Sequence, residues 1–386
     1  MRRSHIGVLA LALPLALGPA VAPASAAGPS PAPLVKVADA PAAQEIEGRY
    51  IVTLKGGVDP AALVKDKSVK ARHLYRKVLN GFAAELSAER LEELRRDSRV
   101  LAIEEDQRAG GTATQTNPPW GLDRIDQRSG LSGTYSYGRN GYGVTAYIID
   151  SGIDTAHPDF GGRARNVFDA YGGSGQDCNG HGTHVAGTVG GSTFGVAKGV
   201  QLRGVRVLGC DNRGSYSAII AGFDWVRLNA VKPAVANASL GGGYSSAMNN
   251  AATALANSGV HLAVAAGNEN QDACNVSPAS APGTLTIAAS DSYDRRASFS
   301  NYGNCTDLYA PGVGVDSARL GGGYTSMNGT SMASPHVSGV AALYKSTYGD
   351  TSSATVNNWL IGNSTANVIG GNLSGTPNRL LFKSTL

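Results

Sequence analysis

The chain beyond Trp120 alternates between short apolar runs and segments with helical spacing. The runs carry hydrophobic residues at successive positions, which is typical of parallel strands buried on both faces. They lie at residues 144–149, 203–208, 234–238, 260–265 and 284–289. Helices are expected at residues 184–190, 217–229, 247–257 and 331–348. This order predicts an α/β fold built on a doubly wound parallel sheet.

An earlier stretch of the chain has a different pattern. Residues 50–55 alternate between apolar and polar side chains like a half-buried strand, and residues 81–86 form a second candidate strand. Ser87 is a suitable N-cap for a helix that continues to about Asp97, and an extended pattern resumes at 100–104. These elements predict a compact α+β module that precedes the larger domain.

Composition changes where the pattern changes. Charged residues occupy 27 of the 86 positions from 27 to 112, but only 33 of the 274 positions from 113 to 386. A stretch rich in Gly, Thr and Gln at 109–116 predicts an exposed, cleavable linker at this boundary. With 42 % hydrophobic residues and a net charge of +4, the chain is not expected to be disordered or to bind nucleic acid.

The first residues have the pattern of an export signal. Arg2 and Arg3 precede an apolar stretch at 6–17, and the small residues Ala-Ser-Ala follow at 24–26. The apolar stretch is shorter than the roughly 20 residues that a membrane span needs. We therefore expect a signal peptide at 1–26, a secreted, extracellular protein and no membrane association.

Export to an oxidising compartment favours disulfides over metal-bound thiolates. The cysteines are Cys178, Cys210, Cys274 and Cys305, and no two of them form a C-x-x-C pair. Three pairings are possible. Pairing neighbours along the chain would close loops of 31 and 30 intervening residues, each stabilising by roughly 3 to 4 kcal/mol in the chain-entropy model.

Three polar motifs fall where a doubly wound sheet places its reactive groups, at strand ends and helix starts. Asp150 ends the strand at 144–149, His181 begins a helix and Ser331 begins another. Each residue alone has an ordinary structural explanation, because acids and serines commonly cap helices. A zinc site at His181 and His184 is not expected, because the histidines are three apart with no Glu between them. His184 is expected in the core.

Together the three residues supply what a serine nucleophile needs. An imidazole must accept the hydroxyl proton, and a carboxylate must orient the imidazole and stabilise its charge. A fourth residue, Asn268, follows the strand at 260–265 and offers a side-chain amide to an oxyanion formed beside Ser331. The order Asp150, His181, Ser331 is that of subtilisin.

These segments resemble the secreted subtilisin-like serine proteases of the proteinase K branch, in particular the aqualysin-like enzymes. The resemblance covers 113–386 and rests on Y-I-I-D-S-G-I (147–153), H-G-T-H-V-A-G (181–187), A-A-G-N (265–268) and G-T-S-M-A-S-P-H (329–336). It implies a self-processed serine endopeptidase with Asp150, His181 and Ser331 as the triad and Asn268 as the oxyanion donor. It also implies the disulfides Cys178–Cys210 and Cys274–Cys305.

Residues 50–107 resemble the inhibitory propeptide of the same family, so the resemblance implies a propeptide at 27–112 and a catalytic domain at 113–386. A parallel sheet folds slowly because its contacts are non-local, and a propeptide that folds first would act as its template. Its last strand, near 105–107, is expected to occupy the cleft until self-cleavage near Thr112–Ala113. The expected partners are polypeptide substrates and this propeptide, and the mature enzyme is expected to be a monomer.

By the same resemblance, a peptide substrate adds as a strand between two exposed edges, at 213–216 and 239–242. Without the triad nearby, both edges would be ordinary Gly-rich loops. The residues expected to bind substrate are Gly214, Ser215, Tyr216, Ser239, Leu240, Gly241, Ala265, Ala266 and Gly267. The matched pocket walls, 239–241 and 265–267, contain no acid. We therefore expect a preference for apolar or aromatic residues at P1, the residue before the scissile bond.

The resemblance further implies structural calcium and no catalytic cofactor. One calcium site maps onto Pro282, Thr284 and Asp307, and part of another maps onto Asp123, Asp126 and Gln127. The alternative for Asp123 and Asp126 is a solvated pair of charges in a first helical turn.

Two other classes of protein compete with a protease. A binding protein that kept the fold without turnover would have a broken triad. An esterase of the α/β-hydrolase type would need G-x-S-x-G, but Ala333 stands two residues after Ser331.

Overall fold

The computed structural model describes residues 34–40, 45–107 and 113–386. The predicted signal peptide and Thr112 lie outside these residues. The described chain divides into two compact units, with a boundary between Asp106 and Gln107. No helix in the described ranges is long and apolar enough to cross a membrane.

The N-terminal unit is a five-stranded sheet with two helices, which confirms the predicted α+β module. Its strands follow the order β1-β5-β2-β4-β3. Their bounds are β1 Val37–Ala38, β2 Glu45–Leu54, β3 Ala71–Tyr75, β4 Gly81–Glu85 and β5 Val100–Gln107. The helices are α1 (Pro60–Asp66) and α2 (Ala88–Arg95), and both bury a leucine in the same core as the sheet. The Ser87 side chain accepts from the Arg90 N–H and caps α2, as predicted.

The C-terminal unit is built on a nine-stranded sheet in the order β19-β20-β16-β15-β13-β11-β8-β10-β9. Every pair is parallel except β19 with β20 at one edge. The central strands are β8 (Thr145–Asp150), β10 (Gln201–Arg206), β11 (Ala234–Ala238), β13 (His261–Ala265) and β15 (Leu285–Ser290). The outer strands are β9 (Ala164–Asp169), β16 (Leu308–Pro311), β19 (Thr365–Ala366) and β20 (Arg379–Leu380).

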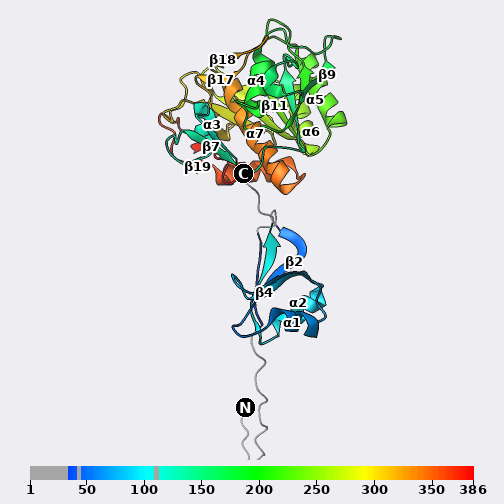
Figure 1. The fold of residues 1–386 in the computed structure, drawn as a ribbon. Coiled ribbons are helices and arrows are strands. Elements are labelled where there is room, and N and C mark those ends of the chain that lie inside the picture. Colours follow the sequence, from blue (N-terminus) through cyan, green and yellow to red (C-terminus); the bar gives the residue numbers. More distant parts are fainter. Residues whose placement is uncertain (1–33, 41–44, 108–112) are drawn as a thin grey trace, which may run out of the picture. The chain divides into compact units, whose positions relative to one another are not determined.

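Helices cover both faces of this sheet, as a doubly wound fold requires (Figure 1). On one face α4 (His181–Gly190) packs against α7 (Thr330–Tyr348), and α5 (Tyr216–Asn229) packs against α6 (Ser246–Asn257) on the other. Strand β8 shows why the interior of such a strand is apolar at successive positions. Ile148 enters the core under α4 and α7, whereas Ile149 enters the core under α5 and α6.

The remaining elements lie around this framework. The helices are α3 (Trp120–Ile125), α8 (Ser353–Asn363), η1 (Pro158–Phe160) and η2 (Ala273–Asn275). The strands are β6 (Ala113–Thr116), β7 (Thr134–Tyr137), β12 (Gly242–Gly243), β14 (Val276–Ser277), β17 (Val315–Ala318) and β18 (Tyr324–Met327). Strand β6 pairs with β7. The prediction of a linker through residue 116 is therefore wrong for its last four residues, whose backbone is paired.

Candidate active site

Asp150 and His181 meet at the carboxyl end of the sheet. β8 ends at Asp150 and α4 begins at His181. One carboxylate oxygen of Asp150 lies 2.7 Å from Nδ1 of His181 and also accepts the Ser151 N–H at 2.8 Å. Asp150 is fully buried, so its charge is poorly screened by water. The carboxylate therefore holds the ring proton on Nδ1 and leaves Nε2 as the basic nitrogen.

The electrostatic environment of His181 favours the protonated ring. Burial lowers the pKa of His181, but the adjacent Asp150 carboxylate more than offsets this effect. The Asp177 carboxylate acts in the same direction, and the net result is a pKa above the usual 6.5. An imidazolium formed during a reaction would thus be stabilised where it forms.

Asp177 also anchors the first turn of α4, and sequence reasoning missed it. Its carboxylate accepts the N–H groups of Asn179 and Gly180 and, through its other oxygen, that of Thr183. It also accepts the Ser151 hydroxyl at 2.9 Å. These bonds tie the helix that carries His181 to the segment after Asp150. An acid shortly before a helix start was the available signal.

A glycine allows this close approach. A Cβ atom at Gly182 would lie 2.1 Å from the carbonyl oxygen of Gly152. Only glycine permits that contact between α4 and the segment that follows β8.

Ser331 is the second residue of α7, and it lines one cavity together with His181. Its hydroxyl donates to the Ser239 carbonyl at 3.2 Å, and the Ser239 hydroxyl donates to the Ser331 carbonyl at 2.7 Å. No hydrogen bond joins Ser331 to His181 in the described chain, so the hydroxyl must turn from the Ser239 carbonyl to the imidazole before its proton can be transferred. Catalytic hydrogen bonds often form only when substrate binds.

Asn268 lies beside Ser331 with its amide oriented by the start of α7. Its Oδ1 accepts the Thr330 N–H at 2.8 Å and the Thr330 hydroxyl at 3.0 Å. Because the carbonyl oxygen is engaged, the NH₂ group remains for a ligand. Asn268 and Ser331 line a second cavity. This is the arrangement expected of an oxyanion donor.

The two predicted substrate edges flank the cavity that contains His181 and Ser331. Residues from both edges line it, namely Gly214, Tyr216, Ser239, Leu240 and Gly241. The second cavity is lined by Ala265 and Gly267 from the other predicted wall. Two predicted residues line neither cavity. Ser215 caps α5 by accepting the Ala218 N–H, and Ala266 is fully buried.

Glu269 also lines the second cavity, next to Asn268. It lies just outside the matched wall, which is why sequence reasoning missed an acid in this pocket. The Glu269 carboxylate accepts from the Asn301 amide at 2.8 Å, and the Glu269 N–H donates to Asn301 Oδ1 at 3.1 Å. The pocket thus combines apolar and backbone walls with one oriented carboxylate.

The disulfides are Cys178–Cys210 and Cys274–Cys305, and no cysteine in the described chain is free. This outcome selects the sequential pairing among the three possibilities. The first disulfide joins the segment before His181 to the segment that leads to the edge at 213–216.

The predicted ligands of the first calcium site come together. Pro282, Thr284 and Asp307 line one cavity. Burial raises the pKa of Asp307 to about 6, even though its carboxylate accepts the Thr286 N–H at 2.7 Å. A half-buried carboxylate beside a loop rich in carbonyl groups fits a hard cation.

The predicted ligands of the second calcium site come together only in part. Asp123 is buried, and its carboxylate accepts the N–H groups of Ser132 and Gly133, so a solvated charge pair is wrong for it. Asp126 has a buried oxygen without a hydrogen-bond partner in the described chain. The Gln127 amide instead donates to the Gly130 carbonyl. No group of three or more acidic, His or Cys side chains suited to a metal occurs in the described ranges.

His184 has the core role that was predicted. It is fully buried, and its Nε2 lies 3.0 Å from the Val315 carbonyl and 3.1 Å from that of Thr325. Burial lowers the pKa of His184 to about 4, so the ring stays neutral. It can therefore donate one proton to these carbonyls without carrying a charge.

Sequence comparison decides the family. The profile of the subtilase family matches residues 141–379, which is more than half of the chain. The chain belongs to the subtilase family. The profile described as peptidase inhibitor I9 matches residues 49–109, so this subtilase also carries an N-terminal inhibitor module.

Named relatives agree with this assignment. This subtilase is 46 % identical over 375 residues to an extracellular serine proteinase of Thermus sp. (strain Rt41A), covering 88 % of this chain and 90 % of the relative. It is 44 % identical over 347 residues to proteinase R of Parengyodontium album, covering 88 % of each chain.

A solved structure agrees as well. The crystal structure of a cold adapted subtilisin-like serine proteinase is 48 % identical, with a TM-score of 0.68, and covers 70 % of this chain and 99 % of its own. The protein is thus a subtilisin-like serine protease, of the proteinase K-like and aqualysin-like type, with an inhibitor-type propeptide.

Proposed function

We propose that this subtilase is a secreted endopeptidase in which Ser331, His181 and Asp150 act as the catalytic triad. The observation that carries the proposal is the 2.7 Å contact between Asp150 and His181 at the rim of a cavity that Ser331 also lines. Secretion is supported by the extracellular relative and by the export pattern at 1–26.

In the proposed mechanism, Nε2 of His181 removes the Ser331 proton as the hydroxyl oxygen attacks the scissile carbonyl. The carbonyl electrons move to its oxygen, which receives hydrogen bonds from the Asn268 amide and from N–H groups at the start of α7. The imidazolium then gives its proton to the leaving amine, and the C–N bond breaks. Water, activated by His181, hydrolyses the acyl-enzyme and restores the Ser331 hydroxyl.

The substrate backbone is proposed to lie between the edges at 213–216 and 239–242. Main-chain hydrogen bonds there would supply affinity with little demand on sequence. The P1 side chain would enter the pocket next to Asn268, whose walls favour apolar and aromatic residues. Glu269 gives this pocket one charged position, which would favour a basic P1 residue over an acidic one.

Maturation and calcium complete the proposal. The domain boundaries remain those expected from sequence: a signal peptide at 1–26, a propeptide at 27–112 and a catalytic domain from 113. The propeptide would inhibit the catalytic domain until self-cleavage near residue 112.

Pro282, Thr284 and Asp307 would hold a structural calcium ion, and Asp123, Asp126 and Gln127 would contribute to a second site. Calcium would stabilise the mature fold and take no part in the chemistry.

The test compares Ser331→Ala with the wild type and with Ser346→Ala, a half-buried position near the other end of α7. Casein and a peptide anilide are the substrates. Ser331→Ala is expected to lose about three or more orders of magnitude in kcat and to accumulate uncleaved precursor. Ser346→Ala is expected to match the wild type. Retained hydrolysis in Ser331→Ala would reject Ser331 as the nucleophile.

A further inference from the structure

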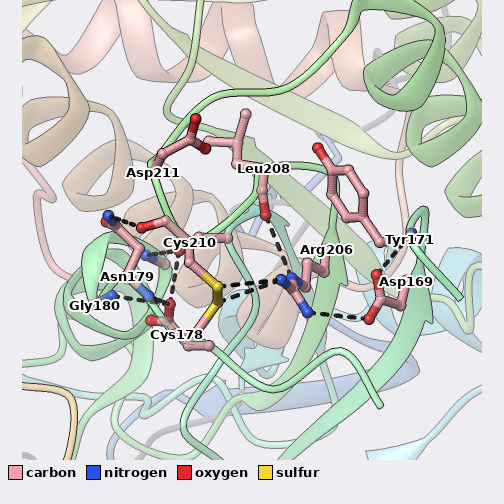
Figure 2. The surroundings of a disulfide bond; sticks show 12 residues. Asp169, Tyr171, Cys178, Asn179, Gly180, Arg206, Leu208, Cys210 and Asp211 are labelled. Atoms are coloured by element: carbon pink, nitrogen blue, oxygen red, sulfur yellow. Dashed lines mark hydrogen bonds and ion pairs between the residues drawn. A yellow bond between two sulfur atoms is a disulfide. The ribbon is translucent and has the colours of Figure 1, made fainter. Parts of the chain in front are cut away.

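Arg206, the last residue of β10, lies where three segments of the chain meet (Figure 2). Its guanidinium group forms an ion pair with Asp169 at 3.3 Å, at the end of β9. Its Cζ atom lies 5.4 Å from the centre of the Tyr171 ring. On the opposite side it contacts the disulfide, with Nη2 3.3 Å from Sγ of Cys178 and 3.8 Å from Sγ of Cys210.

The disulfide that Arg206 contacts joins the two halves of the candidate site. On one side, Cys178 is followed by Asn179, whose Oδ1 accepts the His181 N–H at 3.2 Å. On the other side, Cys210 leads to the substrate edge at 213–216. The Asn179 amide also donates to the Cys210 carbonyl at 3.0 Å. The position of this edge relative to His181 is thus determined by a small number of contacts around Arg206.

The same cluster holds the edge against the end of β10. The Tyr171 hydroxyl group lies within hydrogen-bond distance of two carbonyl oxygens, those of Val207 (3.1 Å) and Arg213 (3.4 Å). A Cβ atom at Gly214 would lie 2.2 Å from the Val207 carbonyl oxygen, so the edge packs directly on this backbone. Arg206 Nε donates to the Leu208 carbonyl at 3.4 Å. The Arg206 guanidinium group therefore contacts both segments that support the edge. It reaches one through the disulfide and the other through the Leu208 carbonyl.

We propose that Arg206 is a positioning residue for the substrate edge. It holds the segment 207–216 at the separation from the His181 helix that a bound peptide strand requires. The proposal rests on the proposed function, because it assigns the edge at 213–216 to the substrate residues before P1. Arg206 itself does not line either cavity of the site.

The chemistry of the side chain explains why arginine suits this position. The guanidinium group is flat and has five N–H donors in a fixed fork, so it can pair with a carboxylate, lie against a ring and donate elsewhere at once. Lysine could retain the pair with Asp169, but its single ammonium group could not also reach the disulfide and the Leu208 carbonyl. Substitution by lysine should therefore preserve part of the effect, and substitution by methionine none.

A positioning role makes a prediction that a purely stabilising role does not. A substrate that extends several residues before P1 uses the edge, whereas the ester of a single amino acid does not reach it. Loss of positioning should therefore raise KM for the long substrate alone. Loss of stability alone would lower the fraction of active enzyme and leave KM unchanged for both.

The experiment measures kcat and KM per titrated active site for a tetrapeptide anilide and a single-residue ester. Arg206→Met and Arg206→Lys are compared with the wild type and with Arg203→Met, which removes another arginine of β10 whose bonds lie away from the disulfide. Arg206→Met should raise KM for the anilide about tenfold and change the ester constants less than about twofold. Arg206→Lys should be intermediate, and Arg203→Met should match the wild type.

Equal changes on the two substrates, or no change on either, would overturn the proposal. If Arg206→Met does not fold, Arg206→Lys decides by the same comparison. Failure of the proposed function would be a separate result. In that case a chain altered only by Ser331→Ala would still hydrolyse the substrates.

Discussion

The Asp150 carboxylate lies 2.7 Å from Nδ1 of His181, although 31 positions separate the two residues. The contact exists because β8 ends at the same edge of the sheet at which α4 begins. It leaves Nε2 free to accept a proton, and it raises the pKa of the ring against the opposing effect of burial. Proton transfer at the site therefore depends on this pair.

The first prediction concerns pH. His181 acts as a base only when neutral, so activity should rise with pH through a pKa above 6.5. Asp150→Asn removes the interaction that raises the pKa and keeps the burial that lowers it. The acidic limb of the kcat/KM profile should move to lower pH, and kcat should fall by about 10³- to 10⁴-fold because the ring tautomer is no longer enforced.

The control for this profile is Asp154→Asn, which alters a nearby acid whose carboxylate instead accepts the Ala156 and Gly321 N–H groups. Its acidic limb should stay in place. An unchanged limb in Asp150→Asn would contradict the assigned pair.

The second prediction concerns the oxyanion. Asn268→Ala removes the proposed donor, and kcat should fall by about 10²- to 10³-fold with little change in KM, since the amide acts on the transition state. Steady-state kinetics on a peptide anilide measures both constants. A change confined to KM would instead indicate that Asn268 binds the substrate ground state.

The third prediction concerns the pocket carboxylate. Glu269→Gln keeps the size of the side chain and removes its charge, so kcat/KM for a P1 Lys anilide should fall by a few-fold, about 1 kcal/mol or less, because the site is partly solvated. The constant for a P1 Phe anilide should change little. Asp272→Asn is a matched control, because this acid lies outside the pocket and caps the helix η2. Parallel changes for both substrates would exclude a charge effect at P1.

The fourth prediction concerns calcium. A ligand that binds only the folded state stabilises by about 2.7 kcal/mol at a hundred times its Kd. The Ser331→Ala chain avoids self-digestion, and its Tm should rise when calcium replaces a chelator. Adding Asp307→Asn should remove most of this rise, whereas adding Asp211→Asn at an exposed position should not. A calcium response that survives Asp307→Asn would place the ion elsewhere.

Sequence patterns predicted the framework because buried elements have strong signals. β8, β11 and β13 enter the cores on both faces of the sheet, and each of their ends lies within one residue of its predicted position. β9 and α8 were missed because about half of their residues are polar and interrupt the hydrophobic pattern. For the same reason β6, which is polar and exposed, was taken for a linker.

The principal residues of the candidate site could be predicted from sequence, but the residues around them could not. Asp150, His181, Ser331 and Asn268 stand at strand ends and helix starts, where a doubly wound sheet concentrates its reactive groups. Asp177 stands shortly before a helix start and Glu269 directly after Asn268, but neither position by itself indicates a role, because the roles depend on side-chain direction and on partners distant in the sequence.

The sequence by itself determined the fold class, the two-part organisation and the identity of the principal reactive residues, because hydrophobic periodicity and short motifs are local properties of a chain. Tertiary structure decided which cysteines pair, that the Ser331 hydroxyl rests on Ser239, that Glu269 enters the pocket and that Arg206 contacts both segments holding the substrate edge. These relationships join residues far apart along the chain, and only the packing of the sheet and its helices brings them within contact distance.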